Sequence, residues 1–424
     1  MRKSKGTHRT VIMVMGIGAF ASAAMRILRE NGAKVLGYLS RDYGHFGPAC
    51  EGPTFYYKQY PDPLEIIKKH RVDLVIPMSI NWHFAEWTDS FLQANVPIFS
   101  PKGEGMLLER DRDYARRLCQ KYRIPFPRAR VARNRLEAMK FLSRHPGAYV
   151  IKNPLCSPNS PVHTIVCESQ KDTASWLRHV DYAEGVFLQE YMGRREVGHV
   201  AFVSGGEIYP IVTNQEYKRA FDGNMGPVAG APLGGLVEAD PDDKYGLVRD
   251  LLHPLLPWFR QSGYSGPVQV TAVRRGRKWY VIEYNVRTGV TTGPAIWRML
   301  EDPVQVMAQV ARNEKLDITF KEENKYGCIL TLAGWGYPYI KIDGPNLPVH
   351  VTGPLTCDVW WNEAEADKDG GIYMTGHRIA DVIAHAPTLQ SAIEKAYENI
   401  KKIECSGSYY RLDIGQSLWP PGEG

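Results

Sequence analysis

The chain lacks several features that would assign it quickly to a class. Its seven cysteines are scattered, odd in number and form no C-x-x-C pair, so we expect reduced thiols in a cytoplasmic protein rather than a disulfide framework or a structural zinc site. No stretch approaches the ~20 consecutive apolar residues of a membrane span. Basic and acidic residues are interspersed and the net charge is a modest +6, which argues against nucleic acid as the main partner.

The sequence also contains no low-complexity linker, no fixed-period repeat and no P-loop of the G-x-x-x-x-G-K-[ST] type. Its 424 residues are too many for one hydrophobic core, so two to four domains are expected. The apolar content of 44% and the charged content of 23% are ordinary for a folded protein.

The N-terminus allows two interpretations. "MRKSKGTHRT" followed by "VIMVMGIGAFASAAM" has the basic start, apolar run and small residues of a signal peptide. The alternative is a buried strand from Val11 to Met15, a turn at Gly16 and Gly18, and an amphipathic helix. We favour the second interpretation, because the apolar character continues beyond a cleavage point and returns as the next strand, "KVLGYL".

Residues 11–100 alternate short apolar runs with amphipathic segments, which predicts a doubly wound α/β domain with a parallel sheet and helices on both faces. Such sheets bind ligands at the carboxyl ends of their strands. Candidate contacts at that edge are residues 16–20, which include Gly16 and Gly18, and residues 77–82, which include Asn81.

After residue 100 the pattern of predicted helices and strands changes twice. Continuous helices are predicted over 104–123 and 244–263, with short strands and helices between 126 and 190 and longer strands from 198 to 325. The last hundred residues are rich in strands. We therefore divide the chain into four parts: 1–105, 106–190, 191–325 and 326–424.

The stretch "YVIEYNVRTGVTTG" carries the most informative pattern. Glu283 and Asn285 lie two apart in an otherwise apolar strand and share one face, and Arg287 follows two residues later. A carboxylate in such a place needs a cation. Arg287 could supply one as a structural salt bridge, but carboxylate and amide oxygens beside cationic groups also suit Mg²⁺ that is shared with nucleotide phosphates.

Three other stretches bear on this site, although each has an ordinary structural explanation. Lys152 ends an apolar strand, where it could touch phosphate or be solvated. "VFLQEYMGRREVG" could present a base-binding turn and a ribose-binding acid, or a solvated loop acid; its candidates are Gln189, Glu190 and Glu196. "EYKRAFDGNMGP" could bind anions in a mobile glycine loop or hold a local salt bridge; its candidates are Lys218, Arg219 and Asp222. Together these stretches describe a nucleotide clamped between two small sheets.

The same motifs, in the same order, resemble the ATP-grasp fold and more closely the phosphoribosylamine-glycine ligase family. "EYKRAFDGNMGP" is similar to that family's "D-H-K-R-A-F-D-G-D-K-G-P", and "VIEYNVRTG" resembles its "x-x-E-F-N-V-R-F-G". "LLERDRDYARRLCQKYRIPFP", "AGWGYPYIKIDG", "MTGHRIADV" and "YYRLDIG" resemble further family segments. The resemblance implies a substrate domain at 1–105, a linker helix with a small ATP-grasp subdomain at 106–190, the central ATP-grasp domain at 191–325 and a β-rich closing domain at 326–424.

Carried over residue by residue, the resemblance implies that Glu283 and Asn285 hold Mg²⁺ (or Mn²⁺) and that Lys152 contacts the ATP phosphates. It implies that the turn at Gln189 and Glu190 frames adenine and that Glu196 binds ribose. Lys218 and Arg219 would lie beside the phosphates, and Arg287 near the transferred phosphoryl group. The family joins a carboxylate to an amine through an acyl-phosphate, a chemistry of positioning and charge neutralisation that needs no catalytic Cys or Ser.

Departures from the family pattern lie mainly at the substrate ends. "GIGAFASAA" lacks the charges of the family's "G-G-R-E-H-A", and "IPMSINWHF", with Asn81, replaces "G-P-E-A-P-L". "GVTT" replaces "G-D-P-E" after the metal strand, and Arg112 stands where the family has a lysine. The lid "NPLCSPNSPVH" contains three prolines, which leaves fewer free amide donors; His163 could replace a lost cation or be an ordinary surface histidine.

These observations lead to one favoured hypothesis and two alternatives. We expect an ATP-dependent carboxylate–amine ligase with altered substrate pockets. The alternatives are an ordinary phosphoribosylamine-glycine ligase and a non-catalytic nucleotide-binding protein. In each case small molecules are the expected ligands, with no nucleic-acid or membrane partner, and the protein is expected to be a monomer or homodimer in the cytoplasm.

Overall fold

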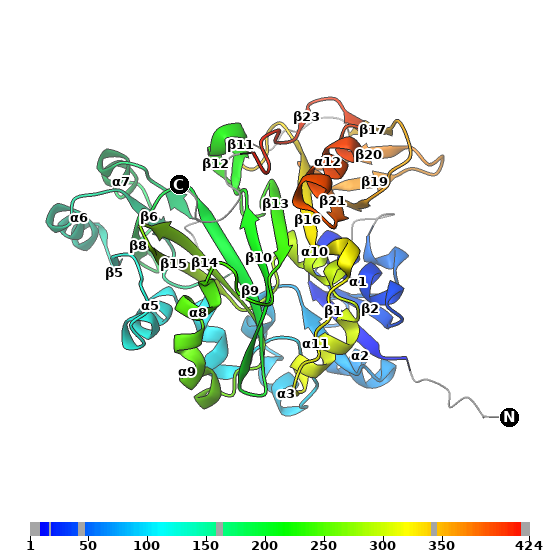
Figure 1. Cartoon of the computed structure of the whole chain (residues 1–424), viewed down its shortest axis with the longest axis horizontal. Coiled ribbons are helices and arrows are strands. Elements are labelled where there is room, and N and C mark those ends of the chain that lie inside the picture. Colours follow the sequence, from blue (N-terminus) through cyan, green and yellow to red (C-terminus); the bar gives the residue numbers. More distant parts are fainter. Residues whose placement is uncertain (1–8, 17, 41–46, 158–163, 341–345, 417–424) are drawn as a thin grey trace.

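The computed structural model describes residues 9–16, 18–40, 47–157, 164–340 and 346–416. Within these ranges the strands form one nine-stranded sheet, three four-stranded sheets and a two-stranded hairpin. In Figure 1 the large sheet occupies the centre, a small sheet with its helices lies at the left, and the N-terminal and C-terminal parts lie at the right.

The N-terminal sheet is parallel and has the strand order β3-β2-β1-β4. Its elements are β1 (Val11–Gly16), α1 (Gly18–Glu30), β2 (Lys34–Leu39), β3 (Thr54–Tyr56), α2 (Pro63–His70), β4 (Leu74–Pro77) and α3 (Thr88–Gln93). Ile12 and Val14 pack with α1, whereas Met13 and Met15 pack in the core that contains α2. Helices therefore cover both faces, which confirms the doubly wound prediction and the strand and helix predicted near the N-terminus.

Local sequence explains where several of these helices begin. The Asp62 side chain accepts a hydrogen bond from the Leu64 N–H, and Pro63 occupies the first helical position of α2, where its missing N–H costs nothing. Asn134 and Thr388 cap α6 (Arg135–Arg144) and α12 (Leu389–Ile400) in the same way.

The helix predicted over 104–123 is wrong as a single element. The structure has α4 (Leu107–Arg110) and α5 (Arg112–Lys121), separated by Asp111 in an extended conformation. The Asp111 carboxylate accepts hydrogen bonds from the N–H groups of Asp113 and Tyr114, so it starts a second helix instead of continuing the first. This break places Arg112 at a helix N-terminus.

The small sheet is antiparallel, with the order β5-β8-β6-β7. Its strands are β5 (Ala129–Ala132), β6 (Tyr149–Lys152), β7 (Ile165–Val166) and β8 (Val186–Glu190), and its helices are α6 and α7 (Gln170–Trp176). Lys152 is the last residue of β6, and Glu190 is the last residue of β8.

The central sheet has the order β15-β14-β9-β10-β13-β16-β21-β18, and β23 also pairs with β16. Its strands before residue 325 are β9 (Glu196–Ser204), β10 (Glu207–Glu216), β13 (Gly234–Ala239), β14 (Gly266–Arg275) and β15 (Lys278–Asn285). The hairpin β11 (Arg219–Phe221) and β12 (Met225–Val228) follows β10 and stands at the top of Figure 1.

The C-terminal part continues the central sheet and adds a small one. Its central strands are β16 (Tyr326–Gly334), β18 (Asp358–Trp361), β21 (Arg378–Ala386) and β23 (Ser408–Tyr409), with α12 packed against β16 and β21. The second small sheet contains β17 (Leu347–Val351), β19 (Ala364–Ala366), β20 (Ile372–Met374) and β22 (Ile403–Cys405). The pairing of β13 with β16 joins the two parts into one sheet, and the four-part division of the chain stays a prediction.

Helices cover both faces of the central sheet. Val197, Ala201 and Val203 of β9 pack with α8 (Leu247–Leu251) and α9 (Leu256–Gln261), whereas Val200 and Phe202 pack with α10 (Thr292–Met299) and α11 (Pro303–Ala311). The continuous helix predicted over 244–263 is wrong, because α8 ends at Leu251 and the 3₁₀ turn His253–Leu255 contains Pro254. A proline inside a helix lacks the N–H that the helix requires.

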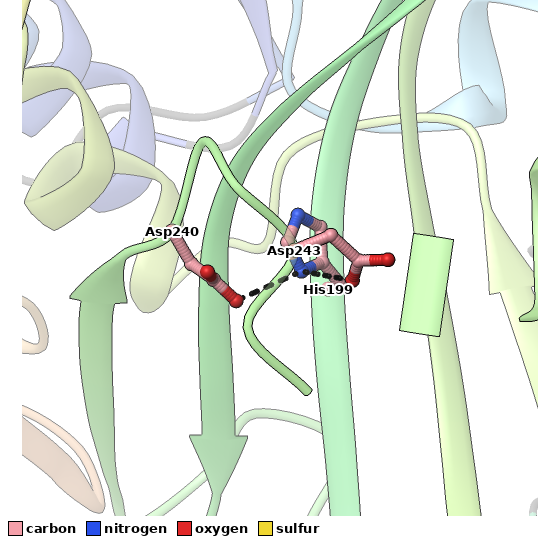
Figure 2. Close-up of side chains that lie close together, drawn as sticks. All are labelled: His199, Asp240 and Asp243. Carbon is pink, nitrogen blue, oxygen red and sulfur yellow. Dashed lines mark ion pairs between the residues drawn. The ribbon is translucent and has the colours of Figure 1, made fainter. Parts of the chain in front are cut away.

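A cluster of potential metal ligands lies on the α8 side of the central sheet (Figure 2). The His199 Nδ1 atom is 3.7 Å from Asp240 Oδ2 and 3.9 Å from Asp243 Oδ1, and His199 is fully buried. All four carboxylate oxygens already accept hydrogen bonds from the protein. Asp243 accepts from the Val248 and Arg249 N–H groups, and Asp240 accepts from the Lys244 N–H and the Thr213 hydroxyl.

These hydrogen bonds also fix which ring nitrogen of His199 carries a proton. The Thr213 hydroxyl has one hydrogen and donates it to Asp240, so it must accept from the His199 Nδ1–H at 3.0 Å. Burial lowers the pKa of His199 to about 4, against the opposing effect of the two aspartates. The cluster is therefore a neutral histidine beneath a carboxylate-capped helix, which explains it without a metal.

We predict that His199 makes the protein less stable in acid. Its pKa in the folded state is about 4, below the value of about 6.5 in an unfolded chain, so its contribution is lost as the pH falls below about 6.5. Replacing His199 with Asn keeps an N–H donor but removes the titration. The loss of unfolding free energy between pH 7 and pH 5, measured by urea denaturation, should shrink by about 2 kcal/mol.

The matched control is His179→Asn, because His179 is exposed in the small subdomain and should leave the pH dependence unchanged. An identical pH dependence in the His199 variant and the unmodified protein would contradict the assignment.

Candidate active site

A cavity of about 620 Å³ lies between the small sheet and the central sheet, bordered also by the β11–β12 hairpin and the segment around Tyr337. Ten residues predicted from the sequence line it: Arg112, Lys152, Gln189, Glu190, Glu196, Lys218, Arg219, Glu283, Asn285 and Arg287. The structure thus brings together residues from α5, both sheets and the hairpin.

Strand alternation places Glu283 and Asn285 on the same face at the end of β15. Glu283 pairs with Thr271 and Asn285 with Gln269 on the neighbouring β14. The register shifts between Thr271 and Ala272, so Ile282 forms a bulge just before this pair. The bulge leaves the Ile282 carbonyl available, and the Gln189 Nε2 atom donates a hydrogen bond to it at 3.0 Å.

Three cations converge on the Glu283 carboxylate. The Lys218 Nζ atom is 3.0 Å from Oε1, and Arg112 Nη1 and Lys152 Nζ lie 3.8 Å and 3.9 Å from Oε2. Lys218 also lies 3.1 Å from Glu196 Oε2 and 3.9 Å from Glu216 Oε2. The cluster therefore contains three cations and three carboxylates at the edge of the cavity.

The cluster shifts the pKa values of its members in opposite directions. Lys218 holds the pKa of Glu283 well below its ordinary value, against burial, and Lys152 and Arg112 act in the same direction. Burial by itself lowers the pKa of Lys218, but Glu196, Glu283 and Glu216 raise it well above its ordinary value. Burial lowers the pKa of Lys152 to about 8, because Glu283 compensates only in part.

Arg287 has a different partner from the one considered in the sequence. Its Nε atom lies 3.3 Å from Glu109 Oε1, and Glu109 Oε2 accepts a hydrogen bond from the Val286 N–H. Glu109 is buried at the end of α4, so it holds the backbone and the guanidinium after β15 in place. The simple salt bridge between Arg287 and Glu283 is not the arrangement found.

Arg112 and Gln189 are held by the small subdomain. The Arg112 Nε atom donates to the Asn153 carbonyl at 3.0 Å, and the Lys152 Nζ atom donates to Gln189 Oε1 at 2.9 Å. The N–H groups of Glu190 and Tyr191 donate to carbonyls within this subdomain, so these two donors are not available to a base.

Lys218 and Arg219 point to different clusters although they are adjacent in sequence. Lys218 belongs to the Glu283 cluster, whereas the Arg219 Nη2 atom donates to Glu168 at 2.7 Å. The loop that follows is anchored to the C-terminal segment. Asp222 accepts from the Leu412 N–H, and the Gly223 N–H donates to Asp413.

Four predicted substrate contacts lie outside the lining of this cavity: Gly16, Gly18, Asn81 and Asp222. Gly16 ends β1, Gly18 begins α1 and Asn81 is exposed in a 3₁₀ turn. Their substrate roles stay predictions. Most of the predicted proline-containing lid, including His163, falls in residues 158–163, which lie outside the described residues.

Sequence reasoning missed three carboxylates near the cavity. Glu109 and Glu216 line it, and Glu168 contacts Arg219 from just outside. Burial raises the pKa of Glu216, and its Oε1 atom accepts a hydrogen bond from Thr292 at 3.4 Å. The position of Glu216 two residues before Lys218 on an apolar strand was the one available signal, because residues two apart share a face.

The donor set fits a hard divalent cation. Glu283 and Asn285 offer a carboxylate and an amide oxygen on one strand face, beside cationic groups suited to phosphate.

Within the part of the chain that the structure describes, no helix combines the length and apolar character that crossing a bilayer requires.

Comparison with known proteins gives a consistent result. The family model for the ATP-grasp (A) domain of phosphoribosylglycinamide synthetase matches residues 110–291, and the model for its C domain matches residues 328–417. Together they span more than half of the chain.

Individual relatives agree with these family models. A phosphoribosylamine–glycine ligase of Listeria innocua is 27% identical over 346 residues, which covers 77% of this chain and 80% of the relative. A phosphoribosylamine–glycine ligase of Fusobacterium nucleatum is 23% identical over 435 residues, which covers 97% of this chain and 99% of the relative.

Solved structures show the fold. The phosphoribosylamine–glycine ligase of Thermotoga maritima gives a TM-score of 0.75 at 22% identity, covering 95% of this chain and all 100% of the other. A biotin carboxylase of Campylobacter jejuni gives a TM-score of 0.69 at 16% identity, covering 95% of this chain and 93% of the other. These likenesses confirm the predicted ATP-grasp fold with its N-terminal parallel-sheet domain and β-rich C-terminal region.

The comparisons do not support the hypotheses of altered substrate pockets or of a non-catalytic protein, and the ordinary ligase fits them better. Enzymes of this type use ATP with Mg²⁺ or Mn²⁺. The chain belongs to the phosphoribosylglycinamide synthetase family and is an ATP-dependent carbon–nitrogen ligase of the ATP-grasp type.

Proposed function

We propose that this chain is a phosphoribosylamine–glycine ligase of purine biosynthesis, as its relatives are named. The observation that carries the proposal is the Glu283 carboxylate, on which three cations converge beside Asn285 in a cavity between two sheets. We further propose that it works in the cytoplasm on small molecules, as a monomer or homodimer, without a nucleic-acid or membrane partner.

The reaction would proceed in two displacements. A carboxylate oxygen of glycine attacks the γ-phosphorus of ATP, the bond to the β–γ bridging oxygen breaks, and ADP leaves. The amine nitrogen of phosphoribosylamine then attacks the acyl carbon, phosphate leaves, and the nitrogen loses a proton. Both steps develop negative charge on phosphoryl or carbonyl oxygens, where fixed cations are most effective.

Each predicted residue has a place in this scheme. Lys152, Arg112 and Lys218 would hold phosphates, with Arg219 beside them, and Arg287 would lie near the transferred phosphoryl group. The turn at Gln189 and Glu190 would frame adenine and Glu196 would take the ribose. Gly16, Gly18, Asn81 and Asp222 would contact substrate.

The divalent ion would be held by Glu283 and Asn285, and when bound it neutralises phosphate charge and fixes the geometry of the phosphates. No protein nucleophile is required. Cys156 lines the cavity, but burial raises the pKa of its thiol, so little of the reactive thiolate is present at neutral pH.

The direct test is turnover. Purified protein with Mg-ATP, glycine and freshly prepared phosphoribosylamine should release ADP and phosphate in equal amounts and form the amide, detected by mass spectrometry. Turnover only with a different acid or amine would contradict the substrate assignment. ATP binding without hydrolysis in any of these mixtures would contradict the enzymatic role.

We predict that Glu283→Gln lowers kcat/KM by at least about 100-fold, since even residues behind metal ligands commonly contribute 10–100-fold. The reason is the loss of the charged metal ligand. Steady-state kinetics measures the effect, and thermal unfolding checks that the fold is retained. Glu207→Gln is the matched control, because Glu207 lies on the same sheet with a side chain 62% exposed.

Asn285→Ala tests the same site without changing its charge. It should lower kcat/KM by about tenfold or more and raise the metal concentration needed for half-maximal activity. Full activity in both variants at low magnesium would remove the metal assignment.

A further inference from the structure

Glu168 lies just outside the cavity and was not singled out in the sequence. It follows β7 in the small subdomain and precedes Ser169, the capping residue of α7. Its side chain is 31% exposed, as an ordinary surface acid could be. Its contacts, however, reach beyond its own subdomain.

The Glu168 carboxylate binds two arginines. Arg194, in the connection between β8 and β9, donates from Nε to Oε1 at 3.0 Å and from Nη2 to Oε2. Arg219, at the start of β11, donates from Nη2 to Oε1 at 2.7 Å. Arg194 makes a two-point contact of the kind that fixes a guanidinium in orientation as well as in position.

Both arginines are also fixed on the hairpin side. The Arg219 Nη1 atom donates to the Gly226 carbonyl at 2.8 Å, and the Arg194 carbonyl accepts from Asn224 Nδ2 at 3.0 Å. One carboxylate therefore connects the small subdomain, the β8–β9 connection and the β11–β12 hairpin. The hairpin and the small sheet both border the cavity.

Arg194, Arg219 and Asn224 line the cavity, whereas Glu168 does not. Two guanidinium groups bound to one carboxylate would repel each other without it. The hydrogen bonds from Arg194 lower the pKa of Glu168, with Arg219 adding to the effect, so the carboxylate is ionised at neutral pH. Its charge holds the arginines together at the border of the cavity.

We propose that Glu168 is a positioning residue for the nucleotide: it holds Arg194 and Arg219 at the border of the cavity and ties the small sheet to the β11–β12 hairpin. The inference rests on the proposed function, since it requires ATP in this cavity. Glu168 itself need not touch the nucleotide. Two arginines that are already oriented lower the cost of ordering these groups when ATP binds.

The experiment compares the full-length protein with Glu168→Gln, using Mg²⁺ and a non-hydrolysable ATP analogue in isothermal titration calorimetry. The variant should bind about fivefold more weakly, which corresponds to about 1 kcal/mol. The KM for ATP should rise by a similar factor, whereas kcat should change less than about twofold. Near 1 M salt, where the Debye length is about 3 Å, the difference in affinity should largely disappear.

The matched control is Glu137→Gln. Glu137 lies on α6 of the same subdomain and pairs with Arg133 on the exposed surface, so its loss should leave nucleotide affinity unchanged. Glu168→Asp should recover part of the affinity because it restores the charge. In a variant that carries both Arg194→Gln and Arg219→Gln, adding Glu168→Gln should weaken binding no further, as expected when the carboxylate acts only through these two arginines.

Equal or tighter nucleotide binding by Glu168→Gln would overturn this inference and leave the proposed function intact. A further loss of affinity on adding Glu168→Gln to the double arginine variant would also overturn it, because the carboxylate would then act independently of the arginines. If the unmodified protein binds no nucleotide, both the proposed function and this inference fail.

Discussion

The arrangement of the site depends on one ion-pair cluster around the Glu283 carboxylate. Its cations come from three places: Arg112 from the start of α5, Lys152 from the end of β6, and Lys218 from the segment after β10. A partly buried charge is costly to leave unpaired, so these elements are held together at the point where Glu283 lies. The cluster thus joins α5, the small sheet and the central sheet.

Contacts between distant segments support this cluster from several sides. Glu109 fixes Arg287 and the backbone after β15, and Gln189 connects Lys152 to the bulge before Glu283. The C-terminal Arg411 binds Asp413 and donates to the Arg219 carbonyl and to Asn224. The segment that follows Lys218 is therefore held in part by the C-terminal region of the chain.

Sequence reasoning succeeded where the information was local. Alternation was enough to place Glu283 and Asn285 on one face, and apolar runs identified the N-terminal sheet. Nine of the ten cavity residues were singled out from local strand and loop patterns, the resemblance gave their roles, and Arg112 was found through the resemblance alone. Reasoning failed where a local feature competed with a regular pattern, as at Asp111 and Pro254, which break the predicted helices. It also missed Glu109 and Glu168, because their partners lie 178 and 26 or more residues away. No periodic pattern in one sequence reveals such pairs.

The cluster also suggests how the site accommodates a highly charged ligand. In the structure, the cations proposed to bind phosphate neutralise the carboxylate proposed to bind the divalent ion. Under the proposed function, Lys218, Lys152 and Arg112 would exchange the carboxylate for phosphate oxygens, and Glu283 would help to hold the metal. The charges of these groups would then be paired both before and after binding, which would avoid leaving a desolvated charge without a partner. Arg287 would not take part in this exchange, because it already pairs with Glu109 at the border of the cavity.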